Sequence, residues 1–173
     1  MAKTIAIVFV IILLLGTVFV QVTSRGWLGS QEEAGSVMEI ARPEAVVAEI
    51  EADQAALREL VGASEAKQVL FGDFHVHTTF SFDAFMMNLP MAGGTGAHPP
   101  SDACDFARYC SALDFWSIND HAEGITPQRW AETKESIRQC NEVAADQSNP
   151  DIVAFLGWEW SQVDLDRNKH YGH

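Results

Sequence analysis

The order of the elements expected from residue 68 onward constrains the fold most strongly. Three short apolar segments typical of strands are expected at residues 68–77, 113–118 and 152–156. Two segments with the periodicity of amphipathic helices separate them, one starting at Ser101 and the other at Thr126. Strands that alternate with helices in this way predict parallel βαβ units with right-handed crossovers, and therefore an α/β fold.

Each expected strand ends in side chains that can bind a metal ion. His75 and His77 close the first strand, Asp120 and His121 follow the second, and Glu159 follows the third. Because side chains alternate along a strand, His75 and His77 project from the same face. The carboxyl ends of parallel strands meet at one edge of a sheet, where functional residues of such folds gather. The sequence therefore predicts a metal site at this edge.

The types of ligand indicate which metals the site would take. Mixed imidazole and carboxylate ligands suit Zn²⁺, Mn²⁺ or Fe²⁺, and more than four candidates fit two or three ions better than one. Glu159 stands in an apolar segment, where a cation would remove the cost of burying its carboxylate. Two simpler interpretations stay open: His75 and His77 as surface residues of an edge strand, and Asp120 as a turn cap or as a group that orients an imidazole.

A cluster of divalent ions indicates hydrolysis. Such ions lower the pKa of bound water and clamp an anionic oxygen, which is the chemistry of phosphoester cleavage. Other nucleophiles are weakly supported, because Ser81 and Ser161 lack the Gly-x-Ser-x-Gly elbow and no Walker-type loop is present. Metal-bound water is the expected nucleophile, and no catalytic side chain or general base is assigned.

Four segments resemble motifs of the PHP superfamily, which is named for polymerase and histidinol phosphatase domains. The first motif corresponds to residues 72–83, the second to 119–121, the third to 157–159, and residues 170–173 are similar to a segment of an uncharacterised exported PHP-like branch. Asn119 replaces the usual Thr of the second motif. Order and spacing agree over residues 69–173, so the motifs are specific as a set.

The resemblance implies a distorted seven-stranded β/α barrel, similar to a TIM barrel, with a trinuclear metal centre in its mouth. The implied metal ligands are His75, His77, Asp83, His121, Glu159 and His173, with Asp73, Asp120 and His170 as further ligands or supporting groups. Glu159 matches the glutamate that bridges two ions. The superfamily's later histidine motif and final Asp-x-His motif are absent from these 173 residues. We therefore expect an incomplete, amino-terminal part of the barrel, poorly soluble and inactive alone.

The chain begins with an apolar run from Ile5 to Val20 behind a single lysine, Lys3. The run is long for a signal-peptide core and short for a membrane span, so both interpretations stay open. The expected organisation is a signal peptide or membrane anchor at 1–24, a linker at 25–42, an amphipathic helix at 43–66 and a partial PHP-like domain at 67–173. The protein is therefore expected to be exported, either periplasmic or extracellular or held at the membrane.

Export places the three cysteines in an oxidising compartment. Their odd number cannot form a disulfide framework, and no spacing indicates zinc. Cys104, Cys110 and Cys140 are expected to be small buried hydrophobic residues, with a bridge from Cys140 to the earlier helix as the alternative.

The expected function is that of an exported metal-dependent hydrolase acting on a small-molecule phosphoester or a related anionic substrate. A net charge of −13 excludes a sequence-independent nucleic-acid binder. Two alternatives remain: a metal-binding module of the cell envelope without turnover, and an amidohydrolase-like enzyme on a related barrel.

Overall fold

The computed structural model describes residues 2–24, 32–64, 68–96, 98–144 and 146–161. The chain divides into two compact units, one ending at Glu32 and the other beginning at Glu33. Each unit is described by itself.

The first unit contains one helix, α1 (Ala2–Ser24). Residues 3–22 of this helix are long and apolar enough to cross a membrane, with a mean hydropathy of 3.0, and none of them is buried. A secretory signal and a membrane anchor share these properties. The helix is therefore compatible with the expected export.

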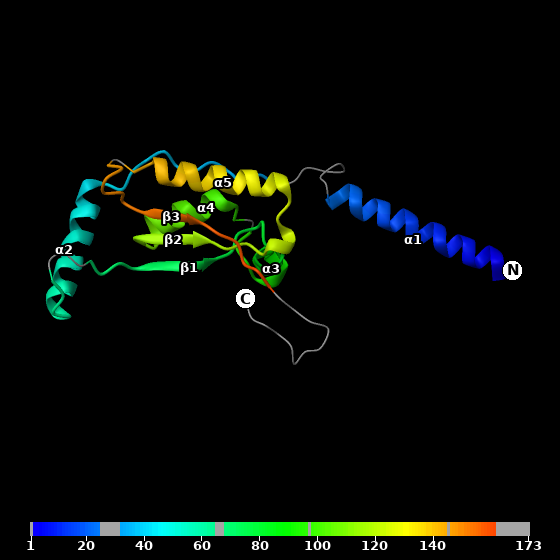
Figure 1. Ribbon diagram of the computed structural model, residues 1–173, viewed down its shortest axis with the longest axis horizontal. Coiled ribbons are helices and arrows are strands. Elements are labelled where there is room, and N and C mark those ends of the chain that lie inside the picture. The colour runs from blue at the N-terminus through cyan, green and yellow to red at the C-terminus, as the bar shows by residue number, and fades with distance from the viewer. Residues whose placement is uncertain (1, 25–31, 65–67, 97, 145, 162–173) are drawn as a thin grey trace. The chain divides into compact units, whose positions relative to one another are not determined.

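The second unit consists of helices and three short strands. In chain order these are α2 (Glu44–Leu60), β1 (Gly72–Val76), α3 (Phe82–Asn88), α4 (Pro100–Asp105), β2 (Phe115–Ile118), α5 (Pro127–Glu142) and β3 (Val153–Leu156). Single helical turns lie at Pro90–Ala92, Phe106–Cys110 and Ala122–Gly124. The strands form a parallel sheet in the order β1-β2-β3 (Figure 1). The predicted α/β fold with parallel strands is confirmed.

Helix α2 is shorter than the helix expected at 43–66. It ends at Leu60, and Gly62 follows with a φ of 64°, a left-handed conformation that glycine adopts readily. None of its residues is fully buried, although Gln54 donates a hydrogen bond of 3.1 Å to Asp114.

The hydrophobic core lies between the sheet and helices α4 and α5. Alternate residues of the central strand, Trp116 and Ile118, are fully buried. The other core residues are Val37, Cys104, Ala107, Ile137, Cys140, Ile152 and Ala154. One face of the sheet is therefore covered by helices.

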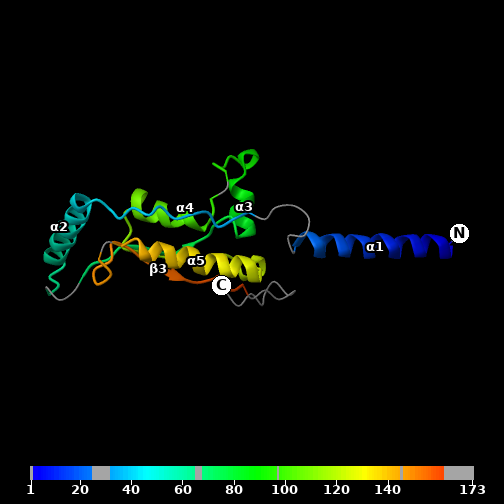
Figure 2. The same cartoon turned by 90° about the horizontal axis from the view of Figure 1, so that it is seen from above.

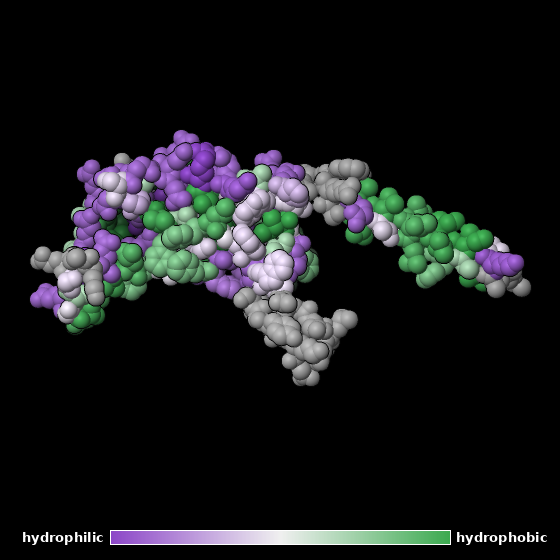
Figure 3. Space-filling model, viewed as in Figure 1, coloured by the Kyte–Doolittle hydropathy of each residue, from purple (hydrophilic) through white to green (hydrophobic). Residues whose placement is uncertain are grey.

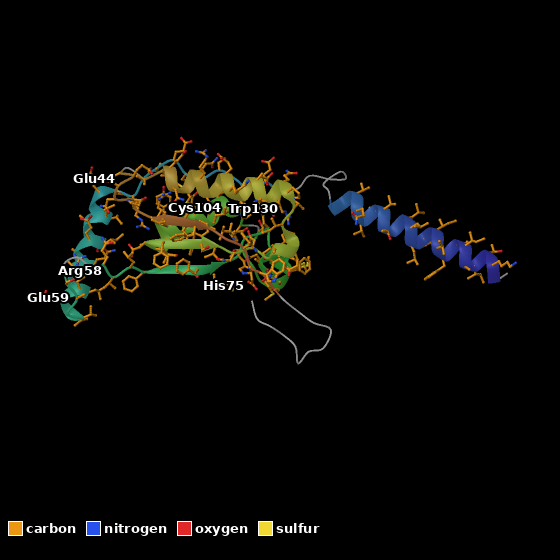
Figure 4. All side chains as sticks on the ribbon, viewed as in Figure 1. Glu44, Arg58, Glu59, His75, Cys104 and Trp130 are labelled. Carbon is orange, nitrogen blue, oxygen red and sulfur yellow. A yellow bond between two sulfur atoms is a disulfide. The ribbon has the colours of Figure 1, made fainter. Side chains whose placement is uncertain are left out.

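A disulfide between Cys104 and Cys140 joins α4 to α5 (Figure 4). The expectation that all cysteines are simply buried hydrophobic residues is therefore wrong for this pair, and the alternative bridge from Cys140 is confirmed. Cys110 is free and exposed, which also departs from that expectation. The spacing of cysteines could not reveal this pairing, because it depends on which helices pack together.

Residues 33–42, which we call the strap, belong to the second unit. Figure 2 shows the strap running along α4, and Val37 lies in the core. The Arg42 side chain is buried and donates hydrogen bonds of 2.6 Å to the carbonyl of Leu113 and 2.7 Å to that of Asp151. Burial lowers the pKa of Arg42, and the charge of Asp151 opposes that effect. This part of the expected linker is thus packed into the domain.

The opposite face of the sheet carries three aromatic rings, one from each strand. Phe74 lies 4.8 Å from Phe115 and 5.7 Å from Phe155, measured between ring centroids. Phe74 is 61% exposed and Phe155 is 44% exposed. Apolar surface is visible over the sheet in Figure 3. The sheet therefore has helices on one face and partly exposed aromatic rings on the other.

We predict that the double substitution Cys104→Ser with Cys140→Ser lowers the free energy of unfolding by at most about 4 kcal/mol. The reason is that the disulfide closes a loop between residues 36 positions apart, which restricts the unfolded chain. Urea unfolding of the variant and the parent measures the difference. Cys110→Ser is the matched control, with an expected change within about 0.5 kcal/mol. Three alkylatable thiols in the unreduced parent protein would contradict the pairing.

Candidate metal centre

The backbone pairing of the sheet continues beyond the ends of β2 and β3. His121 and Glu159 form an isolated parallel bridge. The amide of Ala122 donates to the carbonyl of Glu159 at 2.9 Å, and the amide of Glu159 donates to the carbonyl of Asp120 at 3.1 Å. This pairing brings His121 and Glu159 together at the end of the sheet where His75 is labelled in Figure 4.

Gly157 allows the segment after β3 to lie against the end of β2. A Cβ atom at this position would lie 2.8 Å from the carbonyl oxygen of Ile118 and 2.9 Å from Oγ of Ser117. Any larger residue would push the segment away from β2. The glycine two residues before Glu159 therefore helps to hold that carboxylate at the strand ends.

His75, His77 and Glu159 form the first group of candidate ligands. Oε2 of Glu159 lies 2.9 Å from Nε2 of His77 and 3.3 Å from Nε2 of His75. The two Nε2 atoms are 3.2 Å apart. Ligand atoms that share one Zn²⁺-sized ion, with bonds of about 2.1 Å, are separated by about 3.0–3.5 Å. The spacing of this group fits one cation.

His77, Asp83 and His121 form the second group. The two oxygens of Asp83 each lie 3.4 Å from an imidazole nitrogen, Nδ1 of His77 and Nε2 of His121. A neutral imidazole offers a single lone pair, so His77 can bind only one ion in that form. Oε2 of Glu159 faces the first group, and its Oε1 lies 3.6 Å from Nδ1 of His121, which is not the nitrogen of that ring that faces Asp83.

The structure thus brings together five of the six implied metal ligands. Asp73 lies in neither group, and its Oδ1 accepts a hydrogen bond of 2.8 Å from the amide of His75. The implied ligand His173 and the supporting residue His170 lie outside the described residues.

Asp120 acts on the backbone around the site. Its carboxylate is buried and accepts hydrogen bonds from the amide and the hydroxyl of Thr78, at 2.6 and 2.8 Å. Burial raises the pKa of Asp120, and the two bonds from Thr78 oppose that effect. With both oxygens bound to Thr78, this carboxylate anchors the turn that follows His77.

Ser81 has a supporting role that the sequence reasoning missed, because serine was considered there only as a nucleophile. Its buried Oγ accepts a hydrogen bond of 3.0 Å from the amide of His121 and lies 3.1 Å from Nδ1 of His77. If Nδ1 of His77 carries the proton, it donates a hydrogen bond to Oγ of Ser81, and Nε2 keeps its lone pair for a metal ion of the first group. Hydrogen bonds of this kind to the nitrogen that does not bind the metal set the tautomer of metal-binding imidazoles.

Asp83 is held in its charged form. Burial alone would raise the pKa of Asp83, but hydrogen bonds from the amide of Ala84 and the side chains of Ser81 and His77 outweigh it and lower the pKa to about 2. The carboxylate is therefore an anionic ligand throughout the pH range in which imidazoles are neutral.

A comparison with known protein families finds one match, over part of the chain. Residues 64–149 match a family described as a protein of unknown function (DUF3604). No curated protein and no solved structure matches the chain. The matched segment includes His75, His77, Asp83 and His121 and ends before Glu159.

We predict that His75→Ala with His77→Ala abolishes stoichiometric binding of Mn²⁺ or Zn²⁺. The double substitution removes two of three donors from the first group and one from the second. The metal content of the dialysed protein, measured by inductively coupled plasma mass spectrometry, tests this prediction. His98→Ala is the control, since His98 belongs to neither group. Unchanged metal content in the double variant would overturn the site.

We predict that Ser81→Ala weakens metal affinity by about 10- to 100-fold although it removes no ligand. The physical reason is the loss of the contact that orients His77 and holds the amide of His121. Competition with a fluorescent chelator measures the affinity. Ser136→Ala, a buried serine of α5, is the matched control. Equal affinities in the two variants would show that Ser81 does not support the site.

Proposed function

We propose that this protein is an exported metal-dependent hydrolase that cleaves phosphoesters with the help of two or three divalent ions, Zn²⁺, Mn²⁺ or Fe²⁺. One observation carries the proposal: imidazoles and carboxylates that follow three parallel strands in the sequence converge in two groups of candidate ligands, and Glu159 lies within 3.6 Å of imidazoles from both groups. Phosphoester hydrolysis commonly uses paired ions held in this way.

The donor set fits this chemistry. His75, His77 and Glu159 would hold one ion, and Asp83 with His121 would hold a second. Ions bound there would polarise a phosphoryl oxygen and lower the pKa of a bound water. The His75 side chain is 68% exposed and that of Glu159 only 8%, so the first group is open on the histidine side. A substrate can approach from that side while Glu159 stays shielded from water.

The layering of the sheet supports the PHP-like interpretation. In a β/α barrel, helices cover the outside of the strands and side chains from the inner face fill the interior. Helices α4 and α5 cover one face here, and Phe74, Phe115 and Phe155 gather on the other. The ligand groups lie at the carboxyl ends of the strands, where such barrels carry their active sites. We therefore interpret the sheet as the amino-terminal part of a PHP-like barrel.

Two independent features support export. Helix α1 has the length and apolarity of a signal or anchor. The disulfide between Cys104 and Cys140 is of a kind that persists in oxidising compartments outside the cytoplasm.

Both ligand groups form within the described residues, so we predict, in place of the expectation that the chain is inactive alone, that the full chain loaded with Mn²⁺ or Zn²⁺ hydrolyses 4-nitrophenyl phosphate. Glu159→Gln should lower kcat/KM by about 100-fold or more. The amide keeps the size of the side chain but removes the anionic charge and one of the two oxygens that face the groups. Release of 4-nitrophenol measures the rate. Glu49→Gln, on the exposed face of α2, is the matched control and should keep the parent rate.

The same experiment separates the alternatives. Stoichiometric metal binding without phosphoester turnover would favour a metal-binding module of the cell envelope. Cleavage of amides or lactones with phosphoesters left intact would favour an amidohydrolase-like enzyme.

A further inference from the structure

A cavity of about 800 Å³ adjoins the first ligand group. His75 and His77 form part of its wall, and it extends between β1 and the helical turns of residues 100–110 as far as Cys110 and Leu113. Pockets for small organic ligands measure about 300–1,000 Å³. The cavity is therefore large enough to hold an organic group attached to a phosphate bound at the metal centre.

The wall of the cavity is largely apolar away from the histidines. Met38 of the strap, Val76, Ala103, Phe106 and Leu113 contribute to it. Phe106 is 62% exposed, so its ring can be covered by a ligand. Burial of apolar area stabilises a complex by about 25 cal/mol per Å², which favours an apolar ligand group in this cavity.

The charges along the cavity argue against an anionic group. Asp73, Asp102 and Asp105 line it, and no lysine or arginine does so within the part of the chain that the structure describes. The one further imidazole, His98, lies 3.5 Å from Asp102 and 2.6 Å from the hydroxyl of Thr95. A second phosphate or a carboxylate on the ligand would meet carboxylates without a compensating basic side chain.

We propose that this cavity binds the alcohol part of the phosphoester substrate, and that this part is apolar and carries no anionic group. The inference rests on the proposed function and adds the class of substrate to it. Esters of aromatic or long aliphatic alcohols fit the cavity, whereas nucleoside diphosphates and triphosphates and other esters with further negative charges do not.

Cys110 provides a test that does not depend on turnover, because this free, exposed thiol lines the cavity. The rate of its alkylation by N-ethylmaleimide is measured in the Mn²⁺-loaded full chain with hydrolytically inert phosphonates. We expect 1-naphthylmethylphosphonate at ten times its dissociation constant to slow alkylation about tenfold. Phosphonoacetate has a similar phosphonate group with a carboxylate in place of the ring, and it should give no protection at the same concentration.

Two variants locate the effect. Ala103→Trp places a large side chain in the cavity. Phe106→Ala removes an exposed aromatic ring from the cavity wall and leaves the core unchanged. Both should raise the dissociation constant of the naphthyl compound, obtained from its protection of Cys110, at least about threefold at unchanged metal content, which corresponds to about 0.6 kcal/mol. Ala131→Trp, on the exposed surface of α5, is the control and should keep the protection of the parent.

Equal protection by the two phosphonates, or full protection in both cavity variants, would overturn the inference. Hydrolysis of 4-nitrophenyl phosphate measured on the same preparations keeps the two proposals apart. Turnover without protection of Cys110 means that the cavity inference is wrong and the hydrolase stands. Protection without turnover means that the proposed hydrolase is wrong and the cavity remains a site for apolar phosphonates.

Discussion

The buried carboxylate of Glu159 is the constraint on which the site depends. It lies within 3.6 Å of imidazole nitrogens from His75, His77 and His121 and is only 8% exposed. A carboxylate in such surroundings is stabilised by hydrogen bonds and by nearby positive charge, such as that of a bound cation. The backbone pairing beyond β2 and β3 holds it there, since the same hydrogen bonds that extend the sheet place Glu159 opposite His121.

The helical layer keeps the strands in place for this arrangement. The disulfide fastens α4 to α5 over the sheet, and buried Arg108 pairs with Asp151 at 3.0 Å while donating to the carbonyl of Cys140 at 2.7 Å. Arg42 fastens the strap to the same region by donating hydrogen bonds to the carbonyls of Arg108 and Asp151. A buried arginine is tolerated because backbone carbonyls and a carboxylate accept its hydrogen bonds. Covalent and polar contacts thus support a core with few large apolar side chains.

The charge of the molecule bears on how it would attract a phosphoester. The chain carries a net charge of −13, and three of its aspartates, but no lysine or arginine of the described residues, line the cavity beside the first ligand group. Bound divalent ions would then be the main source of attraction for a phosphate, and the apolar wall would select the alcohol. Under the proposed function, binding and selection are therefore assigned to different parts of the same site.

Local patterns in the sequence were sufficient to predict the parallel α/β fold and to name His75, His77, His121 and Glu159 as candidate ligands. Asp83 was named only from the resemblance to the first PHP motif. The period of two that pairs His75 with His77, and the rule that parallel strands share a carboxyl edge, depend only on backbone geometry. The tertiary structure decided the pairing of Cys104 with Cys140, the burial of Arg42, the supporting contacts of Ser81 and the existence of the cavity. Each of these depends on which distant elements pack against one another, and no local periodicity carries that information.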